Sequence, residues 1–83
     1  MRDFRTFVAG ISGHWIHLRQ ELDGWSVELW GQYPFSCKLP DLTEQVAKDA
    51  ASTLAKEHLL RHGLMAGGGS ELTWRLAVRY TAA

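Results

Sequence analysis

Hydrophobic and polar residues alternate along several stretches of the chain, which is the pattern of β-strands that bury one face. Residues 14–22 and 25–29 alternate regularly, and residues 4–9 are rich in aromatic and β-branched side chains. Residues 71–81 alternate over a longer distance, with one side made of Leu72, Trp74, Leu76, Val78 and Tyr80. We therefore expect about four strands, the last of them long and with one buried face.

Turn-forming residues separate these strands. The glycines of residues 10–13 suit a tight reversal, and Asp23-Gly24 is a strong hairpin signal because a type I′ turn needs positive φ at both central positions. Residues 33–39 predict either a short edge strand or an extended connection, since Gly31 and Pro34 interrupt the pattern. With Asp23 and Gly24 as the loop, the expected pairs are Leu22 with Trp25, Gln20 with Val27, Leu18 with Leu29, Arg19 with Glu28, and His17 with Trp30.

A helix is predicted over residues 42–62, and both of its ends carry signals. Asp41 and Glu44 have the spacing of a capping box at the start. Gly63 fits the left-handed position that closes a helix, with Leu64 able to touch Leu59. The half expected to be buried is mostly alanine, and its members are Val46, Ala47, Ala50, Ala51, Leu54 and His58.

The order of these elements predicts a single α+β domain over residues 1–83. It is a two-layer sandwich in the order β-β-β-α-β, with one helix on one face of a mainly antiparallel sheet. A chain of 83 residues is too short for two separate cores. Its hydrophobic share of 46%, with four Trp and three Phe, supplies large apolar side chains for one core.

Charge, cysteine content and the lack of long apolar runs limit the binding partners and the cellular compartment that we expect. Nine basic residues balance nine acidic ones, so the excess positive charge that drives general nucleic-acid binding is absent. Cys37 is the single cysteine and has no partner for an internal disulfide. The sequence shows neither a signal-peptide pattern nor a long apolar run, which predicts a cytoplasmic protein of bacterial type without a membrane segment.

One helix covers one face of a sheet, so the alternation also predicts what the second face displays. Exposed tryptophans on such a face form an apolar patch typical of an interaction surface. We expect homodimerisation through this face or the binding of a protein partner; the alternative is a platform for single-stranded nucleic acid, in which bases stack on rings and guanidinium groups bind phosphates. The predicted binding surface consists of Trp15, His17, Arg19, Trp30, Arg75 and Arg79.

Candidate catalytic and metal-binding residues are few. His58 and His62 have the i, i+4 spacing of two metal ligands, for which Cys37, His14 or His17 would have to supply a third. The favoured interpretation is a hydrogen-bonded His58 at the edge of the core and a His62 at the carbonyl end of the helix. A lone cysteine is more often a small buried hydrophobe than a nucleophile. We therefore expect no enzyme activity, no bound metal and no cofactor.

A family resemblance follows from the hairpin Leu22-Asp23-Gly24-Trp25-Ser26-Val27 and the helix start Asp41-Leu42-Thr43-Glu44-Gln45-Val46. Over residues 16–60 the chain resembles the β-β-β-α-β arrangement of HicB-like antitoxin domains. The proline-aspartate-leucine-proline-glycine-cysteine stretch of that family has no counterpart in residues 35–42. The resemblance implies an antitoxin-like regulatory domain with a toxin as partner, assembled as a dimer or tetramer and without catalytic residues.

Overall fold

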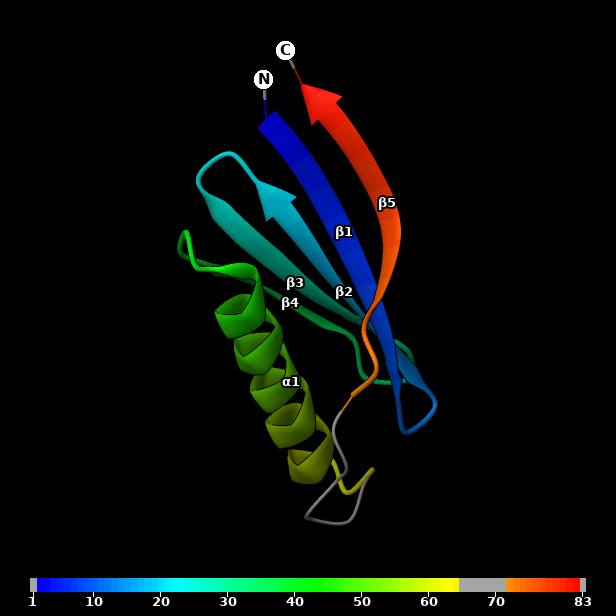
Figure 1. The fold of residues 1–83 in the computed structure, drawn as a ribbon. Coiled ribbons are helices and arrows are strands. Elements are labelled where there is room, and N and C mark those ends of the chain that lie inside the picture. The colour runs from blue at the N-terminus through cyan, green and yellow to red at the C-terminus, as the bar shows by residue number, and fades with distance from the viewer. Residues whose placement is uncertain (1, 65–71, 83) are drawn as a thin grey trace.

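The sheet of this protein is antiparallel throughout and carries its helix on one face (Figure 1). The structure, a computed structural model, describes residues 2–64 and 72–82. Within them the elements are β1 (Arg2–Ile11), β2 (His14–Glu21), β3 (Gly24–Trp30), β4 (Phe35–Leu39), α1 (Glu44–Arg61) and β5 (Arg75–Ala82). The strand order is β4-β3-β2-β1-β5. The predicted α+β class is confirmed, with residues 35–39 as a fifth strand.

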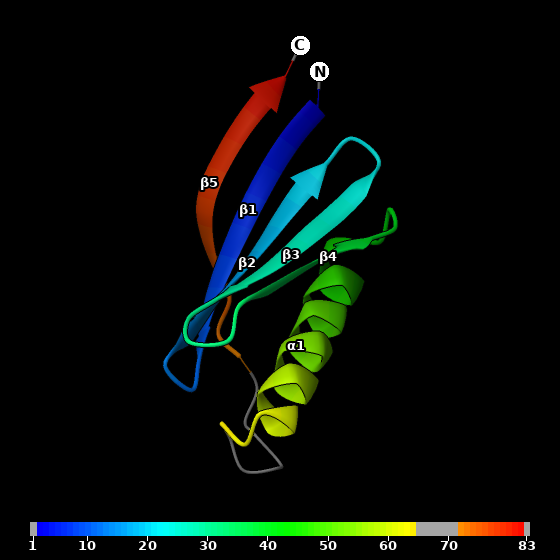
Figure 2. The ribbon, with the colours of Figure 1, turned by 180° about the vertical axis from the view of Figure 1, so that it is seen from behind.

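The helix lies against the β4 side of the sheet, and β1 and β5 extend away from it (Figures 1 and 2). Its buried residues, Ala47, Ala51, Ala55 and Leu59, follow each other at intervals of four. Such a row of small side chains allows a close approach to the sheet. Ala47 and Ala51 belong to the half predicted to be buried, whereas the burial of Ala55 and Leu59 was not predicted. From the predicted half, Val46 is 48% exposed, and Ala50, Leu54 and His58 are half-buried. No helix among the described residues has the length and apolar character needed to cross a membrane.

The turn between β1 and β2 is a two-residue loop, as the glycine-containing segment predicts. Ser12 and Gly13 both have positive φ, at 46° and 76°, which matches the twist of the strands they join. Ile11 and His14 then face each other across the hairpin. This register places Phe7 beside Leu18, under the helix.

The loop between β2 and β3 consists of Leu22 and Asp23, so the predicted Asp23-Gly24 loop is wrong by one position. Glu21 pairs with Gly24, and Leu18 pairs with Val27 rather than with Leu29. A Cβ added to Gly24 would lie 2.2 Å from the carbonyl oxygen of Leu39 in β4. Gly24 is therefore needed for this close approach inside the sheet, which explains its position beyond the loop.

The shift leaves the two faces as predicted. The paired positions move by two residues, and side chains alternate with a period of two, so each side chain stays on its expected face. The largest fully buried side chains of the sheet are Ile16, Leu18, Val27 and Leu29. Phe7 and Trp25 add two rings to this core.

The ends of α1 confirm one prediction and correct another. The N-cap is Thr43, whose hydroxyl accepts a hydrogen bond from the backbone N–H of Val46, so Asp41 does not cap the helix. At the other end the N–H of Leu64 donates to Leu59 O at 2.8 Å and the N–H of Gly63 donates to Leu60 O at 3.1 Å. With Gly63 at φ 69°, this is the predicted Schellman closure.

The predicted C-terminal strand with one buried face is wrong. The strand begins only at Arg75, and Leu76 and Val78 are 51% and 53% exposed. The adjacent β1 residues Thr6 and Phe7 pair with Val78 and Leu76, which leaves Ala77 as an extra residue, a β-bulge. The bulge interrupts the alternation, so Leu76 and Val78 lie on opposite faces of the sheet.

Candidate functional site

The sheet face opposite α1 carries the predicted aromatic residues. Buried Ile16 and Leu18 point toward the helix, so the residues between them in β2 point the other way. Trp15 pairs directly with Trp30 across the β2–β3 ladder, and the two side chains are 50% and 55% exposed. We call this surface the open face; its described members from the predicted set are Trp15, His17, Arg19, Trp30 and Arg75.

The two indole rings are held in place by their neighbours. A Cβ added to Gly10, the β1 partner of Trp15, would lie 3.5 Å from the Trp15 ring, so this ring lies over the bare glycine. The ring of half-buried His17 lies 5.2 Å from that of Trp30. The predicted His17–Trp30 contact therefore exists, although the two residues are diagonal rather than direct partners. These contacts make the aromatic cluster a preformed surface.

A charged cluster lies next to the aromatic one on the same face. Arg19 forms an ion pair with Glu28 at 3.5 Å, which the sequence predicted as a pair, and the ammonium group of Lys38 bonds to the carboxylate of Glu21. The hydrogen bond to Glu21 raises the pKa of Lys38. Because the positive and negative groups neutralise each other in pairs, this cluster presents little net charge.

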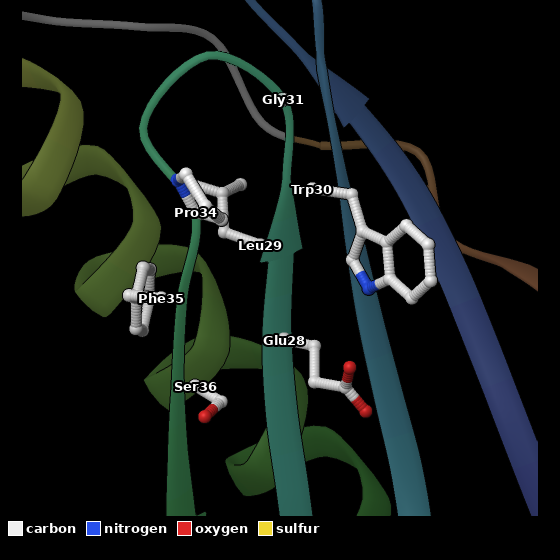
Figure 3. Close-up of a pocket in the computed structure, with 7 residues that line it drawn as sticks. All are labelled: Glu28, Leu29, Trp30, Gly31, Pro34, Phe35 and Ser36. Atoms are coloured by element: carbon white, nitrogen blue, oxygen red, sulfur yellow. The ribbon is translucent and has the colours of Figure 1, made fainter.

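A hollow of about 470 Å³ lies beside Trp30, at the end of β3 and the start of β4 (Figure 3). Figure 3 shows Trp30 and Glu28 on one side of β3 and Phe35 toward the helix on the other. The residues that line it are Glu28, Leu29, Trp30, Gly31, Pro34, Phe35 and Ser36. No pattern in the sequence predicts this hollow, because its shape depends on the loop that joins the two strands.

Of the two β5 arginines predicted for the binding surface, Arg75 lies on the open face, whereas the position of the Arg79 side chain is not described. Arg75 is exposed and pairs with Val8, which in turn pairs with His17, so all three share the open face. The side chain of Arg79 lies outside the described part of the structure, and its backbone pairs with that of Arg5. The bulge at Ala77 removes the regular alternation that grouped Arg79 with Arg75 in the sequence.

Comparison with protein-family models, curated proteins and solved structures finds no match for this chain. Its own geometry must identify the site. Four strands precede the helix, where the HicB-like resemblance implies three, and that resemblance stays a prediction.

The two helix histidines form an aromatic cluster with the β3–β4 loop. The Nε2 atom of His58 lies 2.8 Å from the carbonyl oxygen of Tyr33, and the ring of His62 stacks on the Tyr33 ring at 4.5 Å. The hydrogen-bonded His58 is therefore confirmed. Within residues 2–64 and 72–82, no group of three or more His, Cys, Asp or Glu side chains is placed to hold a metal ion.

The residues considered as third metal ligands or as a nucleophile have structural positions. His14 is buried, with Nδ1 2.8 Å from the carbonyl oxygen of Ser12 and its ring against Gly31. Cys37 pairs with Val27 in the sheet, packs against the core, and has a pKa raised by burial. A raised pKa reduces the thiolate fraction, which weakens Cys37 as a nucleophile.

Proposed function

We propose that this chain is a non-enzymatic interaction module that self-associates through the open face. The observation that carries the proposal is the cross-strand pair of Trp15 and Trp30, each half exposed on a face without helix cover. In a dimer, covering the exposed halves of four indole rings removes on the order of 400 Å² of apolar surface from water. This burial contributes roughly 10 kcal/mol before the costs of association.

The charge pattern of the open face suits a second copy of the same chain. Arg19 is paired with Glu28 and Lys38 with Glu21, so two such faces meet without strong like-charge repulsion. The area of the open face also suits a dimer. Five strands about 4.8 Å apart and about seven residues long give a face on the order of 600 Å². Two copies then bury about 1,200 Å², at the lower limit of stable interfaces.

Replacing one ring tests this proposal. We expect Trp30→Ala to raise the dimer dissociation constant at least tenfold, because the contact would bury its ring, which is 55% exposed in the single chain. The matched control is Leu60→Ala, which removes a 44% exposed apolar side chain from the helix. Sedimentation velocity over a concentration series measures the association, and circular dichroism checks that both variants are folded.

Two results would overturn self-association through this face. One is a wild-type chain that stays monomeric at several hundred micromolar. The other is a dimer that Trp30→Ala leaves intact, or that Leu60→Ala weakens to the same degree.

A further inference from the structure

The two edges of the sheet differ in their protection against strand addition. At one edge, β4 has only five residues, follows Pro34, precedes Pro40, and carries Lys38 in an ion pair. Short length, proline and lysine are common protections of edge strands. At the other edge, β5 has eight residues and no strand beyond it among the described residues. The bulge at Ala77 is a protection of this edge as well, but β5 is longer than β4 and lacks flanking prolines, so it is the edge better able to accept another strand.

The side chains of β5 offer apolar contacts on both faces. Because of the bulge at Ala77, Leu76 lies on the face of Phe7 and Val78 on the face of Thr6. Each is about half exposed, at 51% and 53%. A strand added along β5 would cover Leu76 with one set of its alternating side chains and Val78 with the other.

The sheet is also incomplete where β1 and β5 extend beyond the other strands (Figures 1 and 2). The pairing of β1 with β2 begins at Thr6, whereas its pairing with β5 begins at Arg2. Residues 2–5 and 79–82 therefore form a two-stranded extension. Two strands alone are marginally stable, and a third strand would reinforce them.

The charge of this edge selects among possible strands. The sequence of β5, Arg-Leu-Ala-Val-Arg-Tyr-Thr-Ala, contains two arginines and no acidic residue. Antiparallel pairing of β5 with β5 of a second copy in the register that sets Arg75 opposite Arg79 would place like charges opposite each other, which is unfavourable. An acidic strand places opposite charges there instead.

We propose that the β5 edge binds an extended acidic segment of another protein as a sixth strand of the sheet. Main-chain hydrogen bonds along β5 provide affinity, the apolar contacts at Leu76 and Val78 fix the register, and Arg75 selects acidic side chains. Arg75 and Val78 belong to the rim of the open face, but strand addition uses the main-chain groups of the β5 edge, so binding here does not require self-association.

Synthetic peptides test the proposal directly. The probe is a capped, fluorescein-labelled peptide of eight residues in which Glu alternates with Val, compared with a Lys-Val peptide of the same pattern. A third peptide keeps the Glu-Val sequence but carries an N-methyl group on every backbone amide, which prevents pairing along both of its edges and preserves its charge. Fluorescence anisotropy measures binding, and amide hydrogen exchange locates it.

We expect only the unmodified Glu-Val peptide to bind, with slower exchange in β5. Arg75→Glu should weaken binding at least tenfold, whereas Arg61→Glu, the same charge change at the exposed end of α1, should change it less than twofold. Equal binding of the Lys-Val or N-methylated peptide, protection in β4 instead of β5, or no binding at millimolar peptide would overturn the proposal. Protection of β5 that rises with protein concentration alone would identify a second copy as the occupant and overturn it too.

Discussion

Gly24 shows how one residue can be required for a reason that its neighbours in the sequence do not reveal. Its φ of 154° is unfavourable for residues with a side chain, and an added Cβ would lie 2.2 Å from Leu39 O and 3.0 Å from the carbonyl carbon of Pro40. Gly13 also has positive φ, but a Cβ there would meet nothing within 4 Å. At Gly13 a side chain would meet backbone strain alone, whereas at Gly24 it would meet both backbone strain and a steric clash.

Substitution by alanine measures the difference. We expect Gly13→Ala to lower the free energy of unfolding by about 1 kcal/mol, the cost of a left-handed conformation. Gly24→Ala should lower it by about 3 kcal/mol or more, because β4 must also move away. Urea unfolding at neutral pH measures both. Equal losses would show that the approach of Leu39 to Gly24 is not a constraint on the fold.

At the scale of elements, a short polar network joins β1 to the first turns of α1. Glu44 accepts a bond from Lys48 at 2.9 Å and one from Arg5 at 3.2 Å. The Lys48 ammonium group also lies 4.2 Å from the centre of the Phe7 ring. These contacts hold the start of the helix at β1, while the alanine stripe packs on the centre of the sheet.

The network predicts a pH dependence of stability. The bond from Lys48, followed by that from Arg5, holds the pKa of Glu44 below its usual value. A carboxyl group whose folded pKa is lowered stabilises the fold above its unfolded pKa and loses this contribution as the pH falls through the folded value. The ionised Glu44 should therefore stabilise the protein at neutral pH, and protonation in acid should remove the effect.

Glu44→Gln tests this dependence. We expect a loss of about 0.5 kcal/mol at pH 7, since the half-exposed carboxylate is screened by water. The difference from wild type should shrink steadily below pH 4.5 in urea unfolding. Glu57→Gln, on the exposed side of the same helix, is the control and should show no comparable pH-dependent difference. A Glu44→Gln loss that is the same at pH 7 and in acid would contradict the assignment.

At the scale of the whole molecule, one helix leaves two parts of the sheet available for contact. The open face has an aromatic cluster next to paired charges, and the β5 edge has arginine and exposed apolar side chains. The net charge of zero thus describes the chain as a whole but not its parts. These two surfaces differ in chemistry and should select different partners.

The charge pairing on the open face also predicts weak binding of single-stranded nucleic acid. Arg19 is paired with Glu28, which leaves Arg75 as the one arginine among the described side chains of that face without a carboxylate partner. We expect a 12-nucleotide oligothymidine, whose length suits a single-stranded binding site of about that size, to cause no salt-sensitive quenching of tryptophan fluorescence at low ionic strength. Strong quenching that Trp30→Ala reduces and Leu60→Ala does not would favour the nucleic-acid alternative over self-association.

Much of the fold was predictable because local signals determined it. The alternation of β2 and β3 assigned Trp15 and Trp30 to one face, and Gly63 with Leu64 marked the end of the helix. The loop at residues 22–23 was misplaced by one position, yet the faces were unaffected because the resulting shift was two residues. Local pattern therefore sufficed for which side chains share a face.

Tertiary packing decided the features that depend on residues distant in sequence. Gly24 is required by its close approach to Leu39, the bulge at Ala77 arises in the pairing with β1, and the strand order makes β4 and β5 the two edges of the sheet. The alternation of apolar and polar residues shows only which side chains of one strand point to the same face. Which strands become neighbours depends on contacts made across the folded sheet, and those contacts set the exposure of Leu76 and Val78.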